Sequence, residues 1–228
     1  MGKNDFKATK KKRNKTIAEH KKVKARNPEQ ERFIEYIDRA KVIFAIGPAG
    51  TGKTYVSVRK GIESIILGHK KKFKQIRPAV TAGEDIGHLP GTLDEKMHPY
   101  HGPIHEILTE IGQSSFDIDK LYDENRIEIL SIGYARGYTF NDCYVLVTEA
   151  QNMSPEQMKM ILTRIGNNCT MVIEGDVSQH DLKGKASGLE DAFPRFEKLA
   201  HRDIKTVKLI KIEREPLIVN ILKAYEDE

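Results

Sequence analysis

The sequence predicts an α/β fold in which a parallel sheet is covered by helices on both faces. Apolar runs of strand length alternate along the chain with segments whose apolar residues recur at helical spacing. Strands that alternate with helices build a parallel sheet between two helical layers. A glycine-rich turn joins the first predicted strand to the helix that follows it. The length of 228 residues suits a single core domain of this class.

The elements around the glycine-rich turn have clear signals. Asn27 and Pro28 predict a helix start, with the asparagine as N-cap, the proline in the first turn and Gln30 at the third position. Residues 42–46 form a continuous apolar run of strand length, and residues 53–67 have helical periodicity. We therefore expect the order helix, strand, turn, helix at the start of the domain.

The alternation continues through the second half of the chain. A stretch rich in Gly, Pro and His at residues 76–103 is expected to be an ordered loop region. Ser154, Pro155 and Gln157 form a second capping signal, for a helix that runs to about residue 165. The other expected elements are helices at 104–111 and 216–225 and strands at 127–132, 144–147, 170–173 and 207–212.

Composition narrows the class of protein. Hydrophobic residues make up 39% of the chain and charged residues 31%, which is typical of a globular protein with a strongly charged surface. No apolar run approaches the ~20 residues of a membrane-spanning helix, and the basic N-terminus lacks the apolar segment of a signal peptide. We expect a cytoplasmic protein, in a bacterium or in the host cell of a virus. Cys143 and Cys169 lie in apolar segments, which favours buried reduced thiols over a disulfide or a metal site.

Positive charge is concentrated in one segment. Residues 1–26 carry eleven Lys or Arg against two acidic residues, so this segment has a charge of +9, and the net charge of +5 leaves −4 for the remainder. With few large apolar side chains, the segment is expected to be a disordered basic tail ahead of a domain at residues 27–228. It suits a nucleic-acid-binding arm; a solubilising tail is the alternative.

Residues 47–54 fit the pattern G-x-x-x-x-G-K-[ST] at every fixed position. Its glycines allow successive backbone N–H groups to point at phosphate oxygens, and the following helix adds the positive end of its dipole. Lys53 can bridge the β- and γ-phosphates, and the Thr54 hydroxyl can ligate Mg²⁺. The pattern predicts a P-loop NTPase with a RecA-like sheet that binds ATP and Mg²⁺. The nucleotide-binding residues are expected to be Gly47, Pro48, Ala49, Gly50, Thr51, Gly52, Lys53, Thr54 and Tyr55.

An acidic residue ends the strand predicted at 144–147. P-loop enzymes usually place an Asp-Glu pair there, in which the first residue helps to hold Mg²⁺ and the second polarises water. Here the pair is Thr148 and Glu149. A neutral hydroxyl cannot supply the missing charge, so Mg²⁺ would depend on Thr54, Glu149, water and phosphate oxygens. Glu149 is expected to act as the general base.

A third candidate group follows the strand predicted at 170–173. Glu174, Asp176 and Gln179 stand at the carboxyl end of that strand, where ligands bind in parallel sheets. Gln179 is expected to sense the γ-phosphate or to orient water. An ordinary turn that contains aspartate is the alternative.

Several motifs occur in the order found in the PhoH-like family, whose ATPase domain resembles the first core domain of superfamily 1 helicases. The resemblance covers about residues 27–226. Beside the P-loop it rests on Arg77-Pro78-Ala79-Val80, Ala82-Gly83-Glu84, Leu89-Pro90-Gly91, Arg136-Gly137, Thr139, Glu149-Ala150-Gln151-Asn152, Leu162-Thr163-Arg164, Gly175-Asp176, Gln179, Asp181, Ser187-Gly188-Leu189, Arg214 and Pro216-Leu217.

The resemblance implies ATP hydrolysis, a role with single-stranded nucleic acid, RNA favoured over DNA, and a homo-oligomer that can be a hexameric ring. It also implies that Gln30 reads adenine and that Arg214 approaches the γ-phosphate, although Glu215 can pair with Arg214 and weaken that role. The chain departs from the family at Thr148, which stands where Asp is customary.

Other functions remain open from the sequence. A nucleic-acid-binding module with weak or no turnover is the main alternative, because Thr148 replaces the usual Asp. A nucleotide kinase is disfavoured, since no lid with clustered arginines follows the core. His98, His101 and His105 lack supporting cysteines, and a polar loop that faces nucleic acid is favoured over a zinc site.

Overall fold

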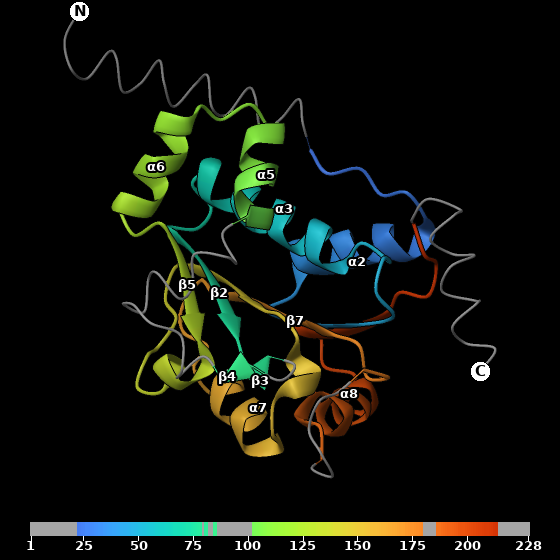
Figure 1. The fold of residues 1–228 in the computed structure, drawn as a ribbon. Coiled ribbons are helices and arrows are strands. Elements are labelled where there is room, and N and C mark those ends of the chain that lie inside the picture. Colours follow the sequence, from blue (N-terminus) through green and yellow to red (C-terminus); the bar gives the residue numbers. More distant parts are fainter. Residues whose placement is uncertain (1–21, 79, 82–83, 86–101, 180–185, 214–228) are drawn as a thin grey trace, which may run out of the picture.

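The computed structural model describes residues 22–78, 80–81, 84–85, 102–179 and 186–213. Its centre is a sheet of six parallel strands in the order β5-β2-β6-β7-β1-β8. These strands are β1 (Val42–Ile46), β2 (Lys72–Arg77), β5 (Ile127–Ser131), β6 (Cys143–Val147), β7 (Thr170–Gly175) and β8 (Ile204–Lys208). Strands β5, β2 and β7 of this sheet are labelled in Figure 1. The predicted parallel α/β sheet is confirmed.

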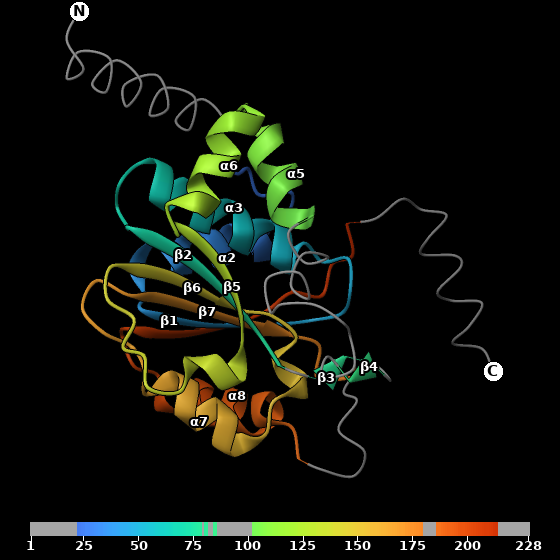
Figure 2. The ribbon, with the colours of Figure 1, turned by 60° about the vertical axis from the view of Figure 1, so that its left-hand side comes forward.

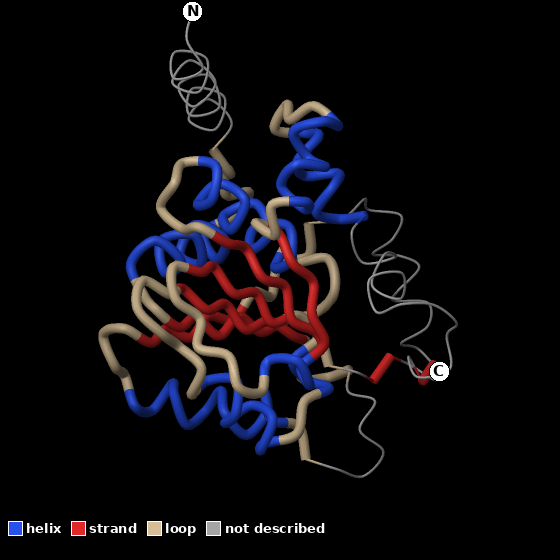
Figure 3. Tube along the Cα trace, turned by 90° about the vertical axis from the view of Figure 1, so that its left-hand side faces the viewer, coloured by secondary structure: helices blue, strands red, loops and turns tan. Residues whose placement is uncertain are grey.

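Helices cover both faces of the sheet, as expected (Figures 2 and 3). One face packs against α2 (Pro28–Arg39), α3 (Lys53–Ile66), α5 (Gly102–Glu110) and α6 (Ser115–Asp123). The other packs against α7 (Pro155–Leu162), α8 (Gly188–Leu199) and the short 3-10 helices η3 (Ile132–Ala135) and η4 (Ala150–Asn152). The described part of the chain contains no helix long and apolar enough to cross a bilayer.

Both predicted helix caps are present. The Asn27 side chain accepts a hydrogen bond from the Gln30 backbone N–H at 2.9 Å, and Pro28 opens α2. Ser154 and Gln157 exchange the two hydrogen bonds of a capping box at the start of α7. Cys143 and Cys169 are buried free thiols, and burial raises the pKa of Cys169 to about 12.

Some elements differ from the expectation. The last strand occupies Ile204–Lys208 and not residues 207–212, because Ile204–Lys208 pairs residue by residue with β1. Residues 76–103 are not only loop: β2 ends within them, β3 (Val80–Thr81) pairs antiparallel with β4 (Glu84–Asp85), and α5 begins there. Strand β2 and helices α6 and α8 were not predicted. The helix expected at 216–225 lies outside the described residues.

Candidate active site

The glycine-rich turn connects β1 to α3, as its pattern requires. Gly47, Gly50 and Gly52 all have positive φ angles, a region that side chains with a Cβ rarely adopt. A Cβ on Gly47 would lie 1.9 Å from the Leu209 carbonyl oxygen, and one on Gly52 would lie 2.6 Å from Gln30 Nε2. The loop can therefore follow this path only with glycine at both positions.

Lys53 and Thr54 begin α3 directly behind this turn. Lys53 Nζ donates hydrogen bonds to the carbonyl oxygens of Gly47 at 2.6 Å and Pro48 at 2.9 Å, which holds the ammonium group against the loop. Thr54 Oγ1 donates to Glu174 Oε1 at 2.6 Å. The first turn of a helix also presents its free backbone N–H groups, so this end of α3 favours an anion.

A cavity of about 280 Å³ lies beside the loop, at the carboxyl ends of β6 and β7. It brings Lys53 and Thr54, together with the predicted loop residues Ala49, Gly50, Gly52 and Tyr55, to the same space as Glu149 and Gln179. The full lining is Ala49, Gly50, Gly52, Lys53, Thr54, Tyr55, Glu149, Gln151, Glu174, Gly175, Asp176 and Gln179. A single site therefore combines a phosphate-binding loop with carboxylates from the neighbouring strands.

Glu149 is held by a residue whose role the sequence did not reveal. Its backbone adopts a left-handed conformation with φ of 55°, just after β6, and its side chain is exposed toward the cavity. Gln151 Nε2 donates to Glu149 Oε2 at 2.7 Å, while Gln151 Oε1 accepts from the Asp176 backbone N–H at 3.1 Å. Gln151 thus joins the end of β6 to the end of β7 and orients Glu149.

Glu174 and Asp176 are the other carboxylates of the site. Glu174 is 2% exposed and accepts hydrogen bonds from Thr54 Oγ1 and Ser57 Oγ. Asp176 Oδ1 accepts from Ser178, whereas its buried Oδ2 has no partner among the described residues. The acidic ending of this apolar strand had placed both carboxylates among the candidate residues, although only Gln179 had been given a role.

The donor set fits Mg²⁺. Hard cations bind oxygen ligands, and this cavity offers the Thr54 hydroxyl with the carboxylates of Glu149, Glu174 and Asp176. The unpartnered Asp176 Oδ2 adds a buried oxygen with capacity to accept. Within the described ranges, no three His, Cys, Asp or Glu side chains form a group that could hold a metal on their own. Mg²⁺ in nucleotide sites commonly also uses phosphate oxygens and water.

Other predicted residues lie elsewhere. Gln30 does not line the cavity: its Nε2 donates to the Thr51 carbonyl oxygen at 3.0 Å, and its Oε1 accepts from the Arg26 backbone N–H. Gly47, Pro48 and Thr51 shape the loop behind the cavity wall. Arg214, and the histidines at 98 and 101, lie outside the described residues.

Tyr55 links the cavity to a second, open groove of about 450 Å³. Tyr55 lines both spaces, and its hydroxyl donates to Glu110 Oε1 at 2.8 Å. The groove is otherwise lined mainly by basic residues: Lys22, Lys24, Arg26 and Arg59, with Val23, Ala25 and Glu110. Arg59 is 5% exposed, and its Nη1 has no hydrogen-bond partner among the described residues. Positive charge therefore extends from the phosphate loop along one side of α3.

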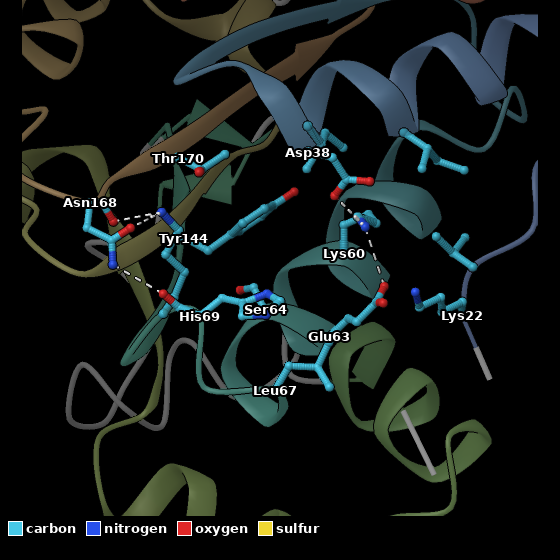
Figure 4. Close-up of a pocket in the computed structure, with 14 residues that line it drawn as sticks. Lys22, Asp38, Lys60, Glu63, Ser64, Leu67, His69, Tyr144, Asn168 and Thr170 are labelled. Carbon is cyan, nitrogen blue, oxygen red and sulfur yellow. Dashed lines mark hydrogen bonds and ion pairs between the residues drawn. The ribbon is translucent and has the colours of Figure 1, made fainter. Parts of the chain in front are cut away.

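A larger cavity, of about 520 Å³, lies at the opposite ends of the strands (Figure 4). Tyr144 and Thr170, at the amino ends of β6 and β7, form part of its wall. Lys60 lies between Asp38 and Glu63, with N–O distances of 2.7 and 3.5 Å. This cavity is distant from the glycine-rich loop, so it contributes nothing to the site.

Comparison with known proteins gives a consistent family. The sequence model described as PhoH-like protein matches residues 22–226. A PhoH-like protein of Bacillus subtilis is 40% identical over 212 residues, 92% of this chain and 66% of that protein. A PhoH-like protein of Mycobacterium tuberculosis is 39% identical over 90% of this chain and 58% of its own length. Protein PhoH of Escherichia coli is 41% identical over 76% and 49%. The chain thus spans between half and two thirds of the lengths of these relatives.

Solved structures with a similar fold are more distant. The Pif1 helicase of Candida albicans is 13% identical, with a TM-score of 0.45 over 88% of this chain and 44% of that one. Bacteroides Pif1 bound to ssDNA is 14% identical, with a TM-score of 0.40 over 88% and 46%.

Proposed function

This chain belongs to the PhoH-like protein family and is a P-loop NTPase, and on that premise we propose that it hydrolyses ATP to ADP and phosphate in the cytoplasm, coupled to single-stranded nucleic acid. One observation carries the proposal of hydrolysis: Lys53, Thr54, Glu149 and Gln179 line the same cavity. A loop that only bound phosphate would not need a carboxylate and an amide on the opposite wall.

Each residue has a distinct task in the proposed reaction. The backbone N–H groups of the loop and the Lys53 ammonium bind the β- and γ-phosphates and stabilise charge that develops on them. Thr54 and Glu149 would hold Mg²⁺, which when bound neutralises phosphate charge. Glu149 accepts the proton of the attacking water, and Gln179 orients that water or contacts the γ-phosphate. Tyr55, at the border of the two spaces, flanks the nucleoside.

Single-turnover hydrolysis at saturating ATP and Mg²⁺ tests this proposal. We expect turnover in the wild type and its loss in Lys53→Ala, since no other ammonium of the loop can replace Lys53. Lys198→Ala, on the distant end of α8, is the matched control and should retain the wild-type rate. Tight ATP binding without any turnover in the wild type would overturn the ATPase and favour the alternative, a nucleic-acid-binding module.

That alternative is supported by one contact. Thr148 is 4% exposed, and its hydroxyl accepts a hydrogen bond from Gln75 Nε2 at 3.3 Å. Position 148, where Asp is customary, therefore carries no charge, and its hydroxyl is used in a structural hydrogen bond with Gln75. We favour the enzyme because Glu149 and Glu174 still line the cavity.

Coupling to nucleic acid, with RNA favoured over DNA, is supported by charge. Lys22, Lys24 and Arg26 continue the basic character of residues 1–21, which lie outside the described residues, up to the edge of the domain at residues 27–228. ATPase rates with and without single-stranded RNA and DNA, at several salt concentrations, test the coupling. Stimulation by RNA at low salt supports it, and identical rates in every condition would contradict it.

We also propose a homo-oligomer, of which a hexameric ring is one form, because coupled movement needs two motor surfaces and the chain carries one P-loop core. In an oligomer, Arg214 of one subunit would approach the γ-phosphate bound by its neighbour. Analytical ultracentrifugation with and without ATP tests this directly. A protein that stays monomeric with full ATPase activity would refute it.

A further inference from the structure

The carboxylate of Glu174 is fixed against the phosphate loop by two hydroxyl groups of α3. Thr54 Oγ1 donates to Oε1 at 2.6 Å, and Ser57 Oγ donates to Oε2 at 2.8 Å. The side chain is buried and still forms part of the cavity wall. Burying a carboxylate is unfavourable unless hydrogen bonds compensate for the lost solvation. For Glu174, one of the compensating partners is the hydroxyl of Thr54 in the P-loop.

The sheet register relates Glu174 to Thr148. In β7, Ile173 pairs with Val147 of β6. Continued by one residue, the same register puts Thr148 beside Glu174. On its other side Glu174 pairs with Ala45 of β1. Because side chains alternate between the two faces of a sheet, Thr148 and Glu174 face the same side, toward α3. Glu174 thus lies on β7, which is flanked by β6, the strand that Thr148 follows, and by β1, the strand that leads into the loop.

This arrangement supplies a negative charge close to position 148, where the usual Asp is missing. P-loop NTPases hold Mg²⁺ with the loop Ser or Thr and an Asp at the end of a neighbouring strand. Thr148 is neutral and bonded to Gln75. A metal-bound hydroxyl that donates to a carboxylate is both oriented by it and made a better ligand. Glu174 already accepts the hydrogen bond of Thr54.

We propose that in this chain Glu174, and not position 148, supplies the carboxylate that balances Mg²⁺ beside Thr54. The inference rests on the proposed nucleotide function and names a residue that does not belong to the customary Asp-Glu pair. A second, independent observation points to a cation: Asp176 Oδ2 is buried in the wall of the same cavity and has no partner among the described residues.

Burial is the largest influence on the Glu174 carboxyl, whose pKa lies above its usual value. Burial raises the pKa of Glu174, while the hydrogen bonds from Thr54 and Ser57 and the charge of Lys53 act to lower it. The nearby charge of Glu149 also raises this pKa. Two carboxylates that repel each other across one cavity are both stabilised in their charged forms when a cation lies between them.

The proposal reverses the effect expected from restoring the usual aspartate. With Glu174 present, Thr148→Asp would place a second carboxylate directly beside Glu174. Two neighbouring negative charges repel each other. We expect that substitution to weaken Mg²⁺-dependent binding or leave it unchanged. In the swap Thr148→Asp with Glu174→Thr, one carboxylate is again present, and Mg²⁺-dependent binding should return.

The test measures the dissociation constant of a non-hydrolysable ATP analogue in Mg²⁺ and in EDTA, using the full chain. The dissociation constant in EDTA divided by that in Mg²⁺ reports how much Mg²⁺ strengthens binding, without any turnover. We expect Glu174→Gln to reduce this ratio by about 10-fold or more, the usual range for groups that support a metal ligand. Glu63→Gln, a buried carboxylate on the same helix as Thr54 but at its far end, should keep the wild-type ratio. Mn²⁺ binding in the presence of the analogue, followed by electron paramagnetic resonance, provides a second readout.

Each outcome decides the matter. A wild-type ratio in Glu174→Gln, or an equal loss of binding in Mg²⁺ and EDTA, overturns the inference and leaves Glu174 a structural residue. If Glu174→Gln does not fold, Thr148→Asp alone still decides, because a gain in the ratio contradicts the proposal. If the wild type binds the analogue in neither condition, the proposed function fails together with the inference. If the wild type binds the analogue but Glu174→Gln keeps the wild-type ratio, only the inference fails and the proposed function stands.

Discussion

Lys74 of β2 and Glu128 of β5 form an ion pair inside the sheet, with 2.5 Å between Nζ and Oε2. Lys74 is 4% exposed, and Glu128 also accepts a hydrogen bond from Lys72 at 2.8 Å. Two lysines of the interior strand β2 thereby share one carboxylate of the neighbouring strand β5. Removing that carboxylate leaves Lys74 buried without its partner.

We expect Glu128→Gln to lower the free energy of unfolding by about 2 kcal/mol, less than the roughly 3–5 kcal/mol of a fully buried pair because Glu128 is partly solvated. Urea denaturation at neutral pH measures this change. Glu124→Gln removes one carboxylate of an exposed pair with Lys120 and is the matched control, with an unchanged midpoint. Equal midpoints for both variants would show that the pair contributes nothing.

The same pair predicts a pH dependence. Burial acts to raise the pKa of Glu128, but the hydrogen bonds from Lys72 and Lys74 outweigh it, and the pKa lies below its usual value. A carboxyl whose pKa is depressed by folding stabilises the fold above its unfolded pKa and loses that contribution as the pH falls through its folded pKa. The stability difference between wild type and Glu128→Gln should be constant above about pH 5 and shrink below it. A difference that grows on acidification would contradict this assignment.

This pair also explains where sequence reasoning failed. Strand β2 has the sequence Lys-Phe-Lys-Gln-Ile-Arg, which lacks an apolar run, so no strand was predicted there. Its polar residues are buried because Glu128 and Thr148, distant in the sequence, satisfy them. Strand β1 was predicted well, since all its residues are apolar and no distant partner is needed.

In the site, too, residues in local motifs were predicted, whereas contacts between residues distant in the sequence were not. The loop residues and Glu149 were predicted because each motif is local, with a strand on one side and a helix on the other. The position of Glu174 beside Thr54 depends on β7 lying between β1 and β6. Residue spacing along the chain does not define that strand order. The tie from Gln151 to both Glu149 and Asp176 likewise appears only once the ends of β6 and β7 lie side by side.

Gly47→Ala tests the path of the phosphate loop. Its Cβ would lie 1.9 Å from the backbone oxygen of Leu209, which is tied to β1 through the hydrogen bond from Leu209 N to Ile46 O. The backbone must therefore shift, and we expect loss of ATP-analogue binding together with a lower melting temperature. At Gly133 the nearest atom to a Cβ is Ser131 Oγ at 3.8 Å, so Gly133→Ala should change neither quantity. Normal analogue binding by Gly47→Ala would mean that the loop tolerates another path.

Gln151→Leu tests the orientation of Glu149. The substitution keeps a similar volume but removes the hydrogen bonds to Glu149 and to the Asp176 backbone. We expect kcat to fall by about 100-fold with little change in KM, because a misplaced base impairs the chemical step more than binding. Steady-state ATPase kinetics measure both constants.

Gln157→Leu is the control for Gln151→Leu. It also removes a glutamine hydrogen bond to a backbone N–H, that of Ser154 at the start of α7. This variant should lose some stability and keep its kcat. If both variants lowered kcat to the same extent, the effect would come from general loosening of the fold and not from the position of Glu149.

The basic residues next to the domain make a quantitative prediction for nucleic-acid binding. If Lys22, Lys24 and Arg26 each neutralise one phosphate of a single strand, replacing all three by Gln should reduce the slope of log K against log salt by about 2. Fluorescence anisotropy with a labelled single-stranded RNA, at several salt concentrations, gives that slope. Replacing Arg195, Lys198 and Arg202, which are exposed residues on or just after α8, removes the same charge from another surface and should leave the slope unchanged. Since both variants lower the net charge equally, an identical drop in slope for the two would mean that RNA responds to overall charge and that the basic segment is only a solubilising tail.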